Sequence, residues 1–324
     1  MNKISATVVA DSINPQGDRL TSLLITFPRI LLSEINTHRM LSKNTSSSRA
    51  IPFKKMVEAV QENPFIPIAW QKEHTGMQGS EYLVDEEDVE YAIGTWLHQR
   101  DRAIEDAKIL NSGGGVTKQL CNRLLEPFMW TTMLITGSKE GWDNFFKLRC
   151  PQYKIHQGTY KSKKEALKYG LSNGELKNWS DLDWLQNNEG HAEIHIMELS
   201  EKIYDAVNES TPKQLKAGEW HIPFVDKIHI DGIQGIQFTL KGGSTEYHEA
   251  KWTTEAKIKI STAMAARTSY TVVGDEKEID YSKMIELHDR LLSQNPPHSS
   301  PMEHCCVCVT DEDYNKSFKG EEKG

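Results

Sequence analysis

Two strand-like runs near the start of the sequence lead directly into a helix, and this succession constrains the fold more than any other feature. The runs cover residues 4–10 and 20–27, are rich in β-branched and apolar residues, and are joined by the turn-like sequence Asn14-Pro-Gln-Gly-Asp18. Pro28 then suits the first turn of a helix in which apolar residues recur at helical spacing. We therefore predict a β-hairpin that feeds a short amphipathic helix.

Amphipathic helices are predicted along much of the remaining chain. Residues 85–110 carry an apolar stripe among charged residues, and Gly113-Gly-Gly115 ends the pattern. Further helical patterns cover residues 54–62, 142–149, 191–207, 253–266 and 283–293. Helices mixed with hairpin strands predict one α+β (mixed α/β) domain over residues 1–324, with a central, largely antiparallel sheet flanked by helices. No Gly-x-Gly-x-x-Gly sequence follows a strand, so a Rossmann site is not expected.

Composition narrows the kinds of partner. A hydrophobic content of 38% suffices for a core, and the net charge of −8 disfavours a surface that coats nucleic acid, so no nucleic-acid partner is expected. Any phosphate site must then be a local basic pocket. No apolar run is long enough to span a bilayer and no leader is recognisable, so we expect a cytoplasmic protein without membrane contact. The five cysteines are expected to be reduced thiols.

The segment from Asn36 to Arg49 concentrates groups that bind anions. It contains His38, Arg39 and the hydroxyl cluster Ser46-Ser-Ser48. Hydroxyl and backbone N–H groups donate hydrogen bonds to phosphate oxygens, and an arginine fork adds bidentate charge-assisted bonds. On residue types alone, a solvated Ser/Thr loop beside a helix-terminal arginine explains the segment equally well.

The spacing within this segment resembles the core motif of the flavin-dependent thymidylate synthases, the ThyX family. That motif reads Arg-His-Arg, seven residues, Ser, and here His38-Arg39 precedes Ser47 and Arg49 at the corresponding spacing. A second landmark of the family is a Leu-Arg followed later by an Ala-Gln-x-Glu-Ile helix. Leu148-Arg149 and the sequence from His191 to Met197 are similar to it.

The resemblance predicts a function for two arginines, whereas the helical patterns in which they lie do not. Arg149 ends a predicted helix, where the helix dipole favours a cation without any function. Arg123 lies on a predicted helix with an apolar opposite face. By resemblance, Arg149 is the arginine of the second landmark, and Arg123 falls where the family carries another substrate arginine.

A third landmark lies near the C-terminus and changes the order of the motifs. The sequences Ala265-Ala-Arg-Thr-Ser-Tyr270 and His298-Ser-Ser-Pro-Met-Glu-His304 resemble the family's Ala-Arg-Val-Ser and His-x-x-Pro-Phe-Glu-His pair. In compact family members this pair precedes the Arg-His-Arg motif, which implies a circular permutation. The permutation predicts that the strand at residues 305–309 lies beside the N-terminal strand that feeds the first helix, with both termini close together at the surface.

The resemblance implies a chemistry and a set of residues. The implied reaction converts dUMP to dTMP with methylenetetrahydrofolate as carbon donor, NADPH as reductant and FAD as cofactor, in a homotetramer whose flavin pocket lies between subunits. Arg149 is the implied catalytic residue, because a guanidinium beside the uracil ring stabilises negative charge raised on it. The implied dUMP-binding residues are Glu34, Ser46, Ser47, Ser48, Arg49, Arg123 and Arg149. The implied FAD-binding residues are Thr37, His38, Arg39, Thr45, Asn144, His298 and Ser300, and no metal is expected.

The chain departs from the family pattern at four positions. Thr37 replaces the first arginine of the motif, Glu34 a glutamine, Thr45 a glutamate, and His195 the glutamate of the second landmark. These changes leave the nucleotide arginines intact and alter the flavin side. Alternatives therefore stay open: a related flavin-dependent one-carbon transfer to another pyrimidine nucleotide, or a non-catalytic nucleotide-binding protein. A divergent, phage-like protein acting in a host cytoplasm fits the permuted order.

Three further segments complete the interpretation. Residues 152–188 form an apparent insertion that compact members lack, and we interpret its basic part as a solvated helix rather than a nucleic-acid-reading module. Residues 311–324 are a polar tail expected to fray. Strand alternation sends Cys306 and Cys308 to one face and Cys305 to the other, which disfavours a zinc site. Cys150 is interpreted as structural, because the family resembled here needs no cysteine nucleophile.

Overall fold

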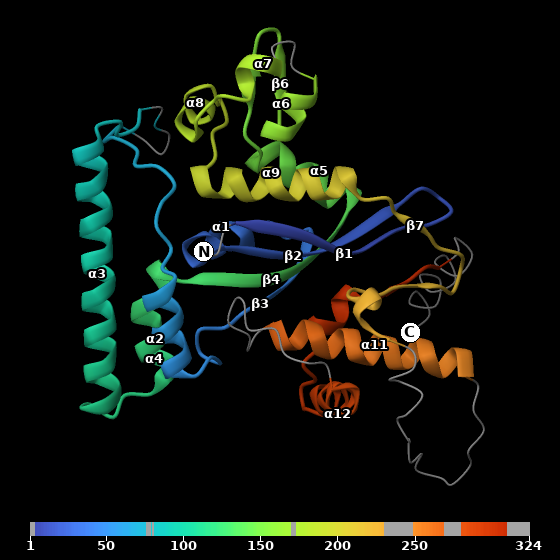
Figure 1. Cartoon of the computed structure of the whole chain (residues 1–324). Helices are drawn as coiled ribbons and strands as arrows, with labels where there is room; N and C mark the ends of the chain where they lie inside the picture. Colours follow the sequence, from blue (N-terminus) through green and yellow to red (C-terminus); the bar gives the residue numbers. More distant parts are fainter. Residues whose placement is uncertain are drawn as a thin grey trace.

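The computed structural model describes residues 4–75, 79, 81–169, 173–229, 249–268 and 280–309, without the side chains of residues 173 and 249–252. At its centre lies a five-stranded sheet of order β3-β4-β2-β1-β7 (Figure 1). β1 (Ser5–Ile13) and β2 (Arg19–Pro28) form the predicted antiparallel hairpin. β3 (Leu41–Thr45) and β4 (Trp130–Ser138) extend the sheet antiparallel, and β7 (Lys213–Gln214) adds two residues parallel to β1.

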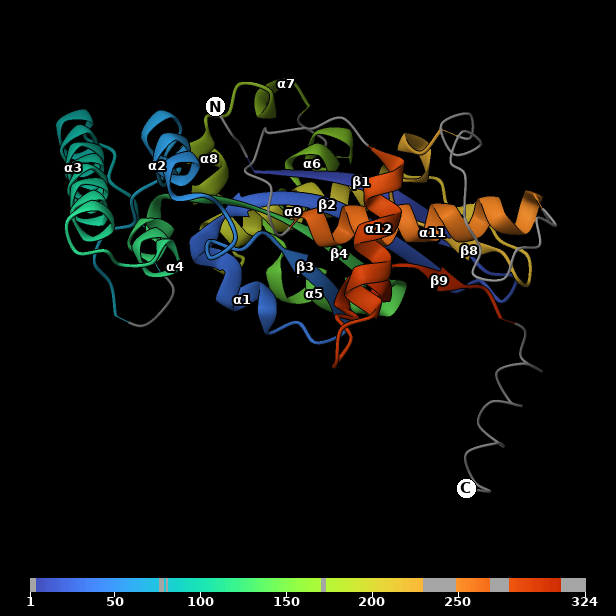
Figure 2. The same cartoon turned by 90° about the horizontal axis from the view of Figure 1, so that it is seen from below.

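Helices cover both faces of the sheet (Figures 1 and 2). α5 (Lys139–Arg149) and α9 (Ile194–Glu209) pack on one face, and α11 (Glu249–Arg267) with α12 (Tyr281–Leu292) lies against the other. Alternation along β4 divides the core, since Met133 and Ile135 join the cluster under α5 and α9 whereas Leu134 packs with Ala265 of α11. The predicted fold class, a mixed α/β fold with a largely antiparallel sheet flanked by helices, is confirmed.

The hairpin continues into the predicted helix, which is short. η1 (Arg29–Leu31) and α1 (Leu32–Asn36) follow Pro28 directly, and Leu31 and Ile35 bury its apolar face in the main core. The chain then returns as β3, so that the anion-binding segment runs from the end of α1 along one edge of the sheet.

A helical unit stands at one end of the sheet (Figure 1). It contains α2 (Phe53–Glu62), α3 (Glu86–Ser112), α4 (Lys118–Cys121) and η2 (Asn122–Phe128), which share a second apolar cluster. The Asp85 side chain accepts hydrogen bonds from two backbone N–H groups at the start of α3, and Gly113 follows its end, as predicted. Arg123, expected on an α-helix, lies in the 3-10 segment that succeeds α4.

The apparent insertion folds as a small lobe on the α9 side of the sheet (Figure 1). It consists of a hairpin of β5 (Tyr153–Ile155) and β6 (Gly158–Tyr160), followed by α6 (Lys163–Tyr169), α7 (Asn173–Leu176) and α8 (Asp181–Gln186). Its members share an apolar core of their own, which includes Ile155, Ala166 and Trp184. No helix in the described parts of the chain is long and apolar enough to cross a membrane.

The C-terminal strand pairs differently from the prediction. β9 (Cys306–Val307) pairs antiparallel with β8 (Trp220–His221) in a separate two-stranded sheet, rather than with the strand that feeds α1. The physical reason is that β1 and β4 already occupy both edges of β2. The 3-10 helices η3 (Val225–Lys227) and η5 (Ser300–His304) flank this small sheet in the sequence, and η5 contacts β3. The predicted polar tail and the predicted closeness of the termini fall outside the described residues.

Buried hydroxyl and imidazole groups connect β8 and η5 to the main sheet. His221 Nδ1 lies 2.7 Å from Ser12 Oγ, and its Nε2 lies 2.8 Å from Ser22 Oγ. Ser22 Oγ in turn lies 2.6 Å from Thr136 Oγ1, which lies 2.7 Å from His304 Nδ1. Burial lowers the pKa of both imidazoles to about 4, so both are neutral at physiological pH.

This network predicts a pH-dependent contribution to stability. The unfolded chain binds a proton at His221 near pH 6.5, whereas the folded chain does so only near pH 4, so the neutral imidazole's contribution is complete above pH 6.5 and is lost as the pH falls toward 4. We expect the difference in free energy of unfolding between wild type and His221→Gln, measured in urea, to shrink across that interval. Burial also raises the pKa of Glu201 to about 7, which makes the free energy of unfolding fall as the pH rises. This effect is the same in both proteins and cancels in the difference between them. An equal difference at pH 7.5 and pH 4.5 contradicts the prediction.

Candidate active site

Arg149 is the last residue of α5, and the helix holds it in a defined place. The Ser138 side chain caps the helix by accepting a hydrogen bond from the backbone of Gly141 at 3.2 Å. Trp142 and Phe145 are almost completely buried and fix the helix against the sheet. The guanidinium therefore projects from a rigid element, with 21% of the side chain exposed.

Two residues of the anion-binding segment and its helix orient this guanidinium. Arg149 Nε donates to His38 Nε2 at 3.0 Å, and Nη1 donates to Glu34 Oε2 at 3.2 Å. Nη2 has no hydrogen-bond partner among the described residues. Residues predicted from two separate motifs thus converge, and among the described residues one donor edge of the arginine remains available for a ligand.

His38 is buried and neutral. Its ring packs edge-on against Phe145, with 4.8 Å between centroids, and 6% of the residue is exposed. Burial, followed by the positive charges of Arg149 and Lys43, lowers its pKa to about 4. Because Nε2 accepts from Arg149, the proton of the neutral ring is assigned to Nδ1. Nε2 thus faces Arg149, and the flavin contact predicted for His38 stays a prediction.

Glu34 sits between two charged neighbours. Burial raises the pKa of this carboxyl, Arg149 opposes the shift, and Glu193 adds to it. Glu193 caps α9 by accepting from the backbone of His195 at 2.9 Å and of Ile196 at 3.0 Å, and it also pairs with the His195 ring. The prediction omitted Glu193 because the predicted helical pattern begins at residue 191, whereas α9 begins at Ile194 with Glu193 as its N-cap.

Cys150, next to Arg149, cannot serve as a ready nucleophile. Its thiol is buried with Sγ 3.1 Å from Ser200 Oγ, and burial raises its pKa to about 12. The thiol is therefore protonated at neutral pH, which agrees with a structural role.

The serine cluster after β3 divides into inward and outward hydroxyls. Ser46 Oγ lies 2.5 Å from Thr131 Oγ1, and Ser48 Oγ donates to Glu126 Oε1 at 2.6 Å; both serines are buried. These two hydroxyls fix the shape of the loop. Ser47 is half-buried, and its hydroxyl has no partner in the described part of the chain, so it is the one available to a ligand.

Two predicted arginines lie near this loop on neighbouring elements. Arg49 is exposed and its Nε donates to Gln119 Oε1 at 3.2 Å, which ties the loop to α4. Arg123 is also exposed, in the 3-10 segment that follows. Both guanidinium groups are accessible to an anion.

A third guanidinium, that of Arg29, supports the same loop and was not predicted. It donates to the carbonyl of Ser46 at 2.6 Å and pairs with Glu126 at 3.7 Å. Burial lowers its pKa, Glu126 opposes the shift, and the positive charge of Arg123 lowers it further. Its only sequence signal was a basic residue after Pro28 at the helix start.

The residues predicted for FAD lie before and at the end of β3, on α5, and before and at the start of η5. Ser300 of η5 and Thr45 at the end of β3 are half-buried, and η5 contacts that strand. The other FAD candidates apart from His38 are exposed: Thr37, Arg39, Asn144 and His298. Neither described cavity is lined by any of them. The described part of the chain thus offers a cation and hydroxyls of the kind that fit a dinucleotide cofactor.

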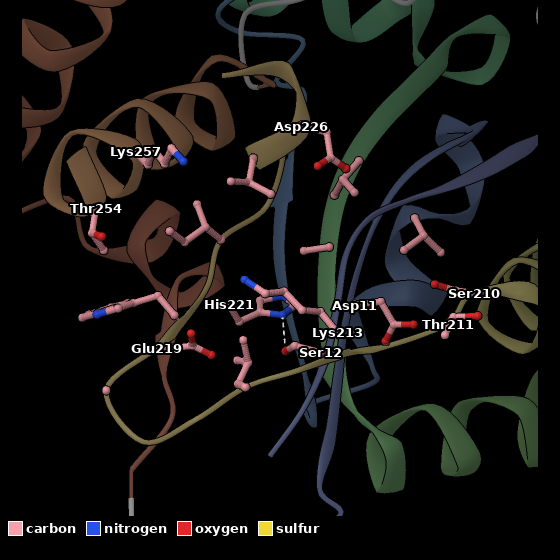
Figure 3. Close-up of a pocket in the computed structure, with 18 residues that line it drawn as sticks. Asp11, Ser12, Ser210, Thr211, Lys213, Glu219, His221, Asp226, Thr254 and Lys257 are labelled. Atoms are coloured by element: carbon pink, nitrogen blue, oxygen red, sulfur yellow. Dashed lines mark hydrogen bonds between the residues drawn. The ribbon is translucent and has the colours of Figure 1, made fainter. Parts of the chain in front are cut away.

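One of the two described cavities, of about 610 Å³, follows the β1 edge (Figure 3). Lys213, His221 and Ser12 lie at its centre, and Lys257 projects from α11 above them. None of the predicted site residues lines it. The second cavity, of about 620 Å³, lies between the lobe and α9.

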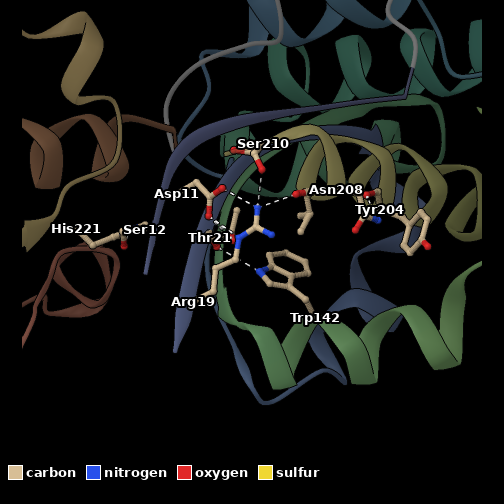
Figure 4. Close-up of polar contacts among 10 residues, drawn as sticks. Asp11, Ser12, Arg19, Thr21, Trp142, Tyr204, Asn208, Ser210 and His221 are labelled. Atoms are coloured by element: carbon tan, nitrogen blue, oxygen red, sulfur yellow. Dashed lines mark hydrogen bonds and ion pairs between the residues drawn. The ribbon is translucent and has the colours of Figure 1, made fainter. Parts of the chain in front are cut away.

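Asp11, whose carboxylate lines this cavity, has a structural role (Figure 4). Asp11 pairs with Arg19 at 2.6 Å and accepts from Thr21 at 3.1 Å. Arg19 also donates to the carbonyls of Val207 at 2.7 Å and Ser210 at 3.2 Å, which anchors the hairpin to the end of α9. Burial raises the pKa of Asp11, but hydrogen bonds from Arg19, Ser210 and Thr21 together with the positive charge of Arg19 outweigh burial and lower the pKa.

Comparison with known proteins yields distant structural similarity. No family model and no curated protein matches the sequence. Among solved structures, the chain is similar to the UMP/dUMP methylase PolB from Streptomyces cacaoi bound with 5-Br dUMP, at 12% identity and a TM-score of 0.43 over 63% of this chain and 90% of that one. It is also similar to the flavin-dependent thymidylate synthase ThyX from Helicobacter pylori complexed with FAD and dUMP, at 16% identity and a TM-score of 0.29 over 58% and 67%. At these values the similarity assigns neither family nor function.

Proposed function

We propose that the protein methylates the uracil ring of dUMP at C5, giving dTMP, with methylenetetrahydrofolate, NADPH and FAD. The observation that carries the proposal is the Arg149 guanidinium, which His38 and Glu34 orient while no other described residue bonds to Nη2. The motif resemblance suggests the substrate, and this geometry gives Glu34, His38 and Arg149 a physical role in activating it.

Arg149 would activate the pyrimidine electrostatically. Uracil C5 becomes nucleophilic only when negative charge is raised on the ring, and a preorganised guanidinium beside the ring oxygen or N3 stabilises that charge. His38 contributes by accepting from Nε without adding a second positive charge, because its imidazole is neutral. Glu34 fixes the other side of the fork. The arginine thus needs little reorganisation when the charge develops.

The phosphate of the nucleotide would be held at the serine loop. Arg49 and Arg123 present exposed guanidinium groups, Ser47 offers a free hydroxyl, and Arg29 supports the loop from beneath. Such a local concentration of cations is what a phosphate site requires within a chain of net charge −8.

A flavin bound near β3 would supply the electron pair that reduces the transferred carbon to a methyl group. Arg39 suits its pyrophosphate, and Thr45, Asn144, His298 and Ser300 offer hydrogen bonds. The proposal includes a second subunit beside this site, as in the homotetramer that the resemblance implies.

Glu34 gives a reason to test a cytosine nucleotide as a second substrate. Glu34 stands beside Arg149 with 34% of its side chain exposed, where the family carries a glutamine. A carboxylate accepts hydrogen bonds, so it suits the exocyclic amino group of a cytosine nucleotide. One-carbon transfer to dCMP is therefore the alternative reaction at the same site.

Product analysis tests the proposal. Purified protein is incubated with FAD, NADPH and ¹³C-labelled methylenetetrahydrofolate, with either dUMP or dCMP, and the nucleotides are analysed by mass spectrometry. We expect labelled dTMP from dUMP. A labelled cytosine nucleotide would establish the alternative. If the protein binds FAD and dUMP but modifies neither nucleotide, both proposed reactions are contradicted.

A further inference from the structure

The second cavity lies between the lobe and α9, close to Arg149. It lies where α8 stands over the N-terminal end of α9 (Figure 1), and it is lined by Gln71, Tyr82 and Gln152 together with residues between Leu185 and Met197. Gln152 follows Arg149 by three positions. Glu193, which lines the cavity, also shifts the pKa of Glu34, the ion-pair partner of Arg149. The cavity and the candidate active site are therefore neighbours.

Hydrogen bonds make the wall of this cavity a fixed structure. Asn188 Oδ1 accepts from the backbone of Gln152 and of Gly190, both at 2.8 Å, and Nδ2 lies 3.2 Å from Met197 Sδ. The backbone of Glu189 donates to the carbonyl of Gln152 at 2.9 Å. These bonds join the lobe to the chain leaving α5 and to α9, so the cavity keeps its shape without a ligand.

The polar groups of the cavity suit an uncharged ring that carries N–H donors. No lysine or arginine is among its lining residues, and the side-chain amides of Gln152 and Gln186 have no partner among the described residues. Glu189 pairs with Lys154 through one oxygen at 2.9 Å, which leaves the other as an acceptor. A lining with two carboxylates and no lysine or arginine of its own disfavours phosphate, whereas amides and a carboxylate pair with amide-like ring edges.

We propose that this cavity binds the pterin ring of methylenetetrahydrofolate, which rests on the proposed function and assigns a role to the lobe. A pterin edge carries an amino group and ring N–H groups that donate to carboxylate and amide oxygens, whereas uracil presents two carbonyl oxygens around a single N–H. Tyr82, Ile194 and Met197 add apolar surface for the ring. The volume of about 620 Å³ lies within the range of small-molecule sites and exceeds the needs of a single pyrimidine.

Direct binding tests this assignment separately from turnover. The probe is 5-formyltetrahydrofolate, a stable reduced folate, titrated calorimetrically into wild type and into the double variant Gln152→Leu/Gln186→Leu. Both side chains are exposed and the change roughly keeps their volume, so folding is preserved. Gln99→Leu on the exposed face of α3 is the matched control. The affinity for dUMP is measured in the same three proteins.

We expect wild type and Gln99→Leu to bind the folate equally, and the double variant to bind it about tenfold more weakly, as the loss of two neutral hydrogen bonds implies. The dUMP affinity should be the same in all three. Absence of folate binding to wild type, equal binding in all three proteins, or a loss confined to dUMP would overturn the proposal. Wild type that binds the folate through these glutamines yet makes no dTMP would contradict the proposed function alone.

Discussion

Replacing Arg149 with alanine is expected to lower kcat/KM for dUMP by roughly 100- to 1,000-fold, the usual effect of removing a preorganised donor to developing negative charge. The loss should fall mainly on kcat, because the guanidinium interacts more strongly with the charged transition state than with neutral uracil. Arg149→Lys should recover little of it, since an ammonium cannot donate to His38 and Glu34 while presenting a free edge. Steady-state kinetics of dTMP formation measure this.

The fold should survive the Arg149 substitution. The ion pair with Glu34 is partly exposed on both sides, and such pairs contribute on the order of 1 kcal/mol or less. Far-ultraviolet circular dichroism and thermal unfolding check this, and Lys147→Ala, which removes an exposed cation from the same helix, is the matched control. Activity of Arg149→Ala equal to that of Lys147→Ala would refute the catalytic assignment.

Removing both arginines near the serine loop is expected to weaken dUMP binding. Each charge-assisted contact to phosphate contributes roughly 1.5–3 kcal/mol, so Arg49→Ala/Arg123→Ala should raise the KM for dUMP by about 100-fold or more. The kcat at saturating substrate should stay near the wild-type value, because the phosphate contacts are equal in ground and transition states. Kinetics over a wide dUMP range give both constants.

Deoxyuridine, which lacks the phosphate, makes this second prediction specific. Its weaker affinity should be the same in wild type and in the double variant, whereas the affinity for dUMP should differ strongly. Lys54→Ala on α2 removes an exposed cation of the same helical unit and serves as the control. A loss of deoxyuridine affinity equal to the loss for dUMP would show that the two arginines act through the fold of the loop instead.

The parts of the fold that were predicted correctly rest on local signals. The hairpin follows from a turn sequence between two apolar runs, and α3 follows from an apolar stripe that begins after Asp85 and ends before Gly113. The pairing of β9 is non-local, and no local pattern records that β1 and β4 fill both edges of β2. The two-residue strand at 306–307 pairs instead with β8, a strand that no sequence pattern predicted.

The candidate site was predictable in its residue types but not in their orientations. Motif spacing selected Glu34, His38 and Arg149, which meet in the structure, but it did not predict that His38 accepts a hydrogen bond from the arginine. Ser46 and Ser48 have the same residue type as Ser47, and only the positions of Thr131 and Glu126 turn their hydroxyls inward. The roles these residues were given with nucleotide or cofactor remain predictions.

Release of tritium from 5-tritiated dUMP tests the central claim most directly, because substitution at C5 must displace the hydrogen there. The proposed function predicts that wild-type protein supplied with FAD, NADPH and methylenetetrahydrofolate releases tritium to water in step with dTMP formation, and that Arg149→Ala does not. Protein that binds dUMP and FAD but leaves the label on the ring under these conditions would contradict the assignment of Arg149 to ring activation and the enzyme function with it.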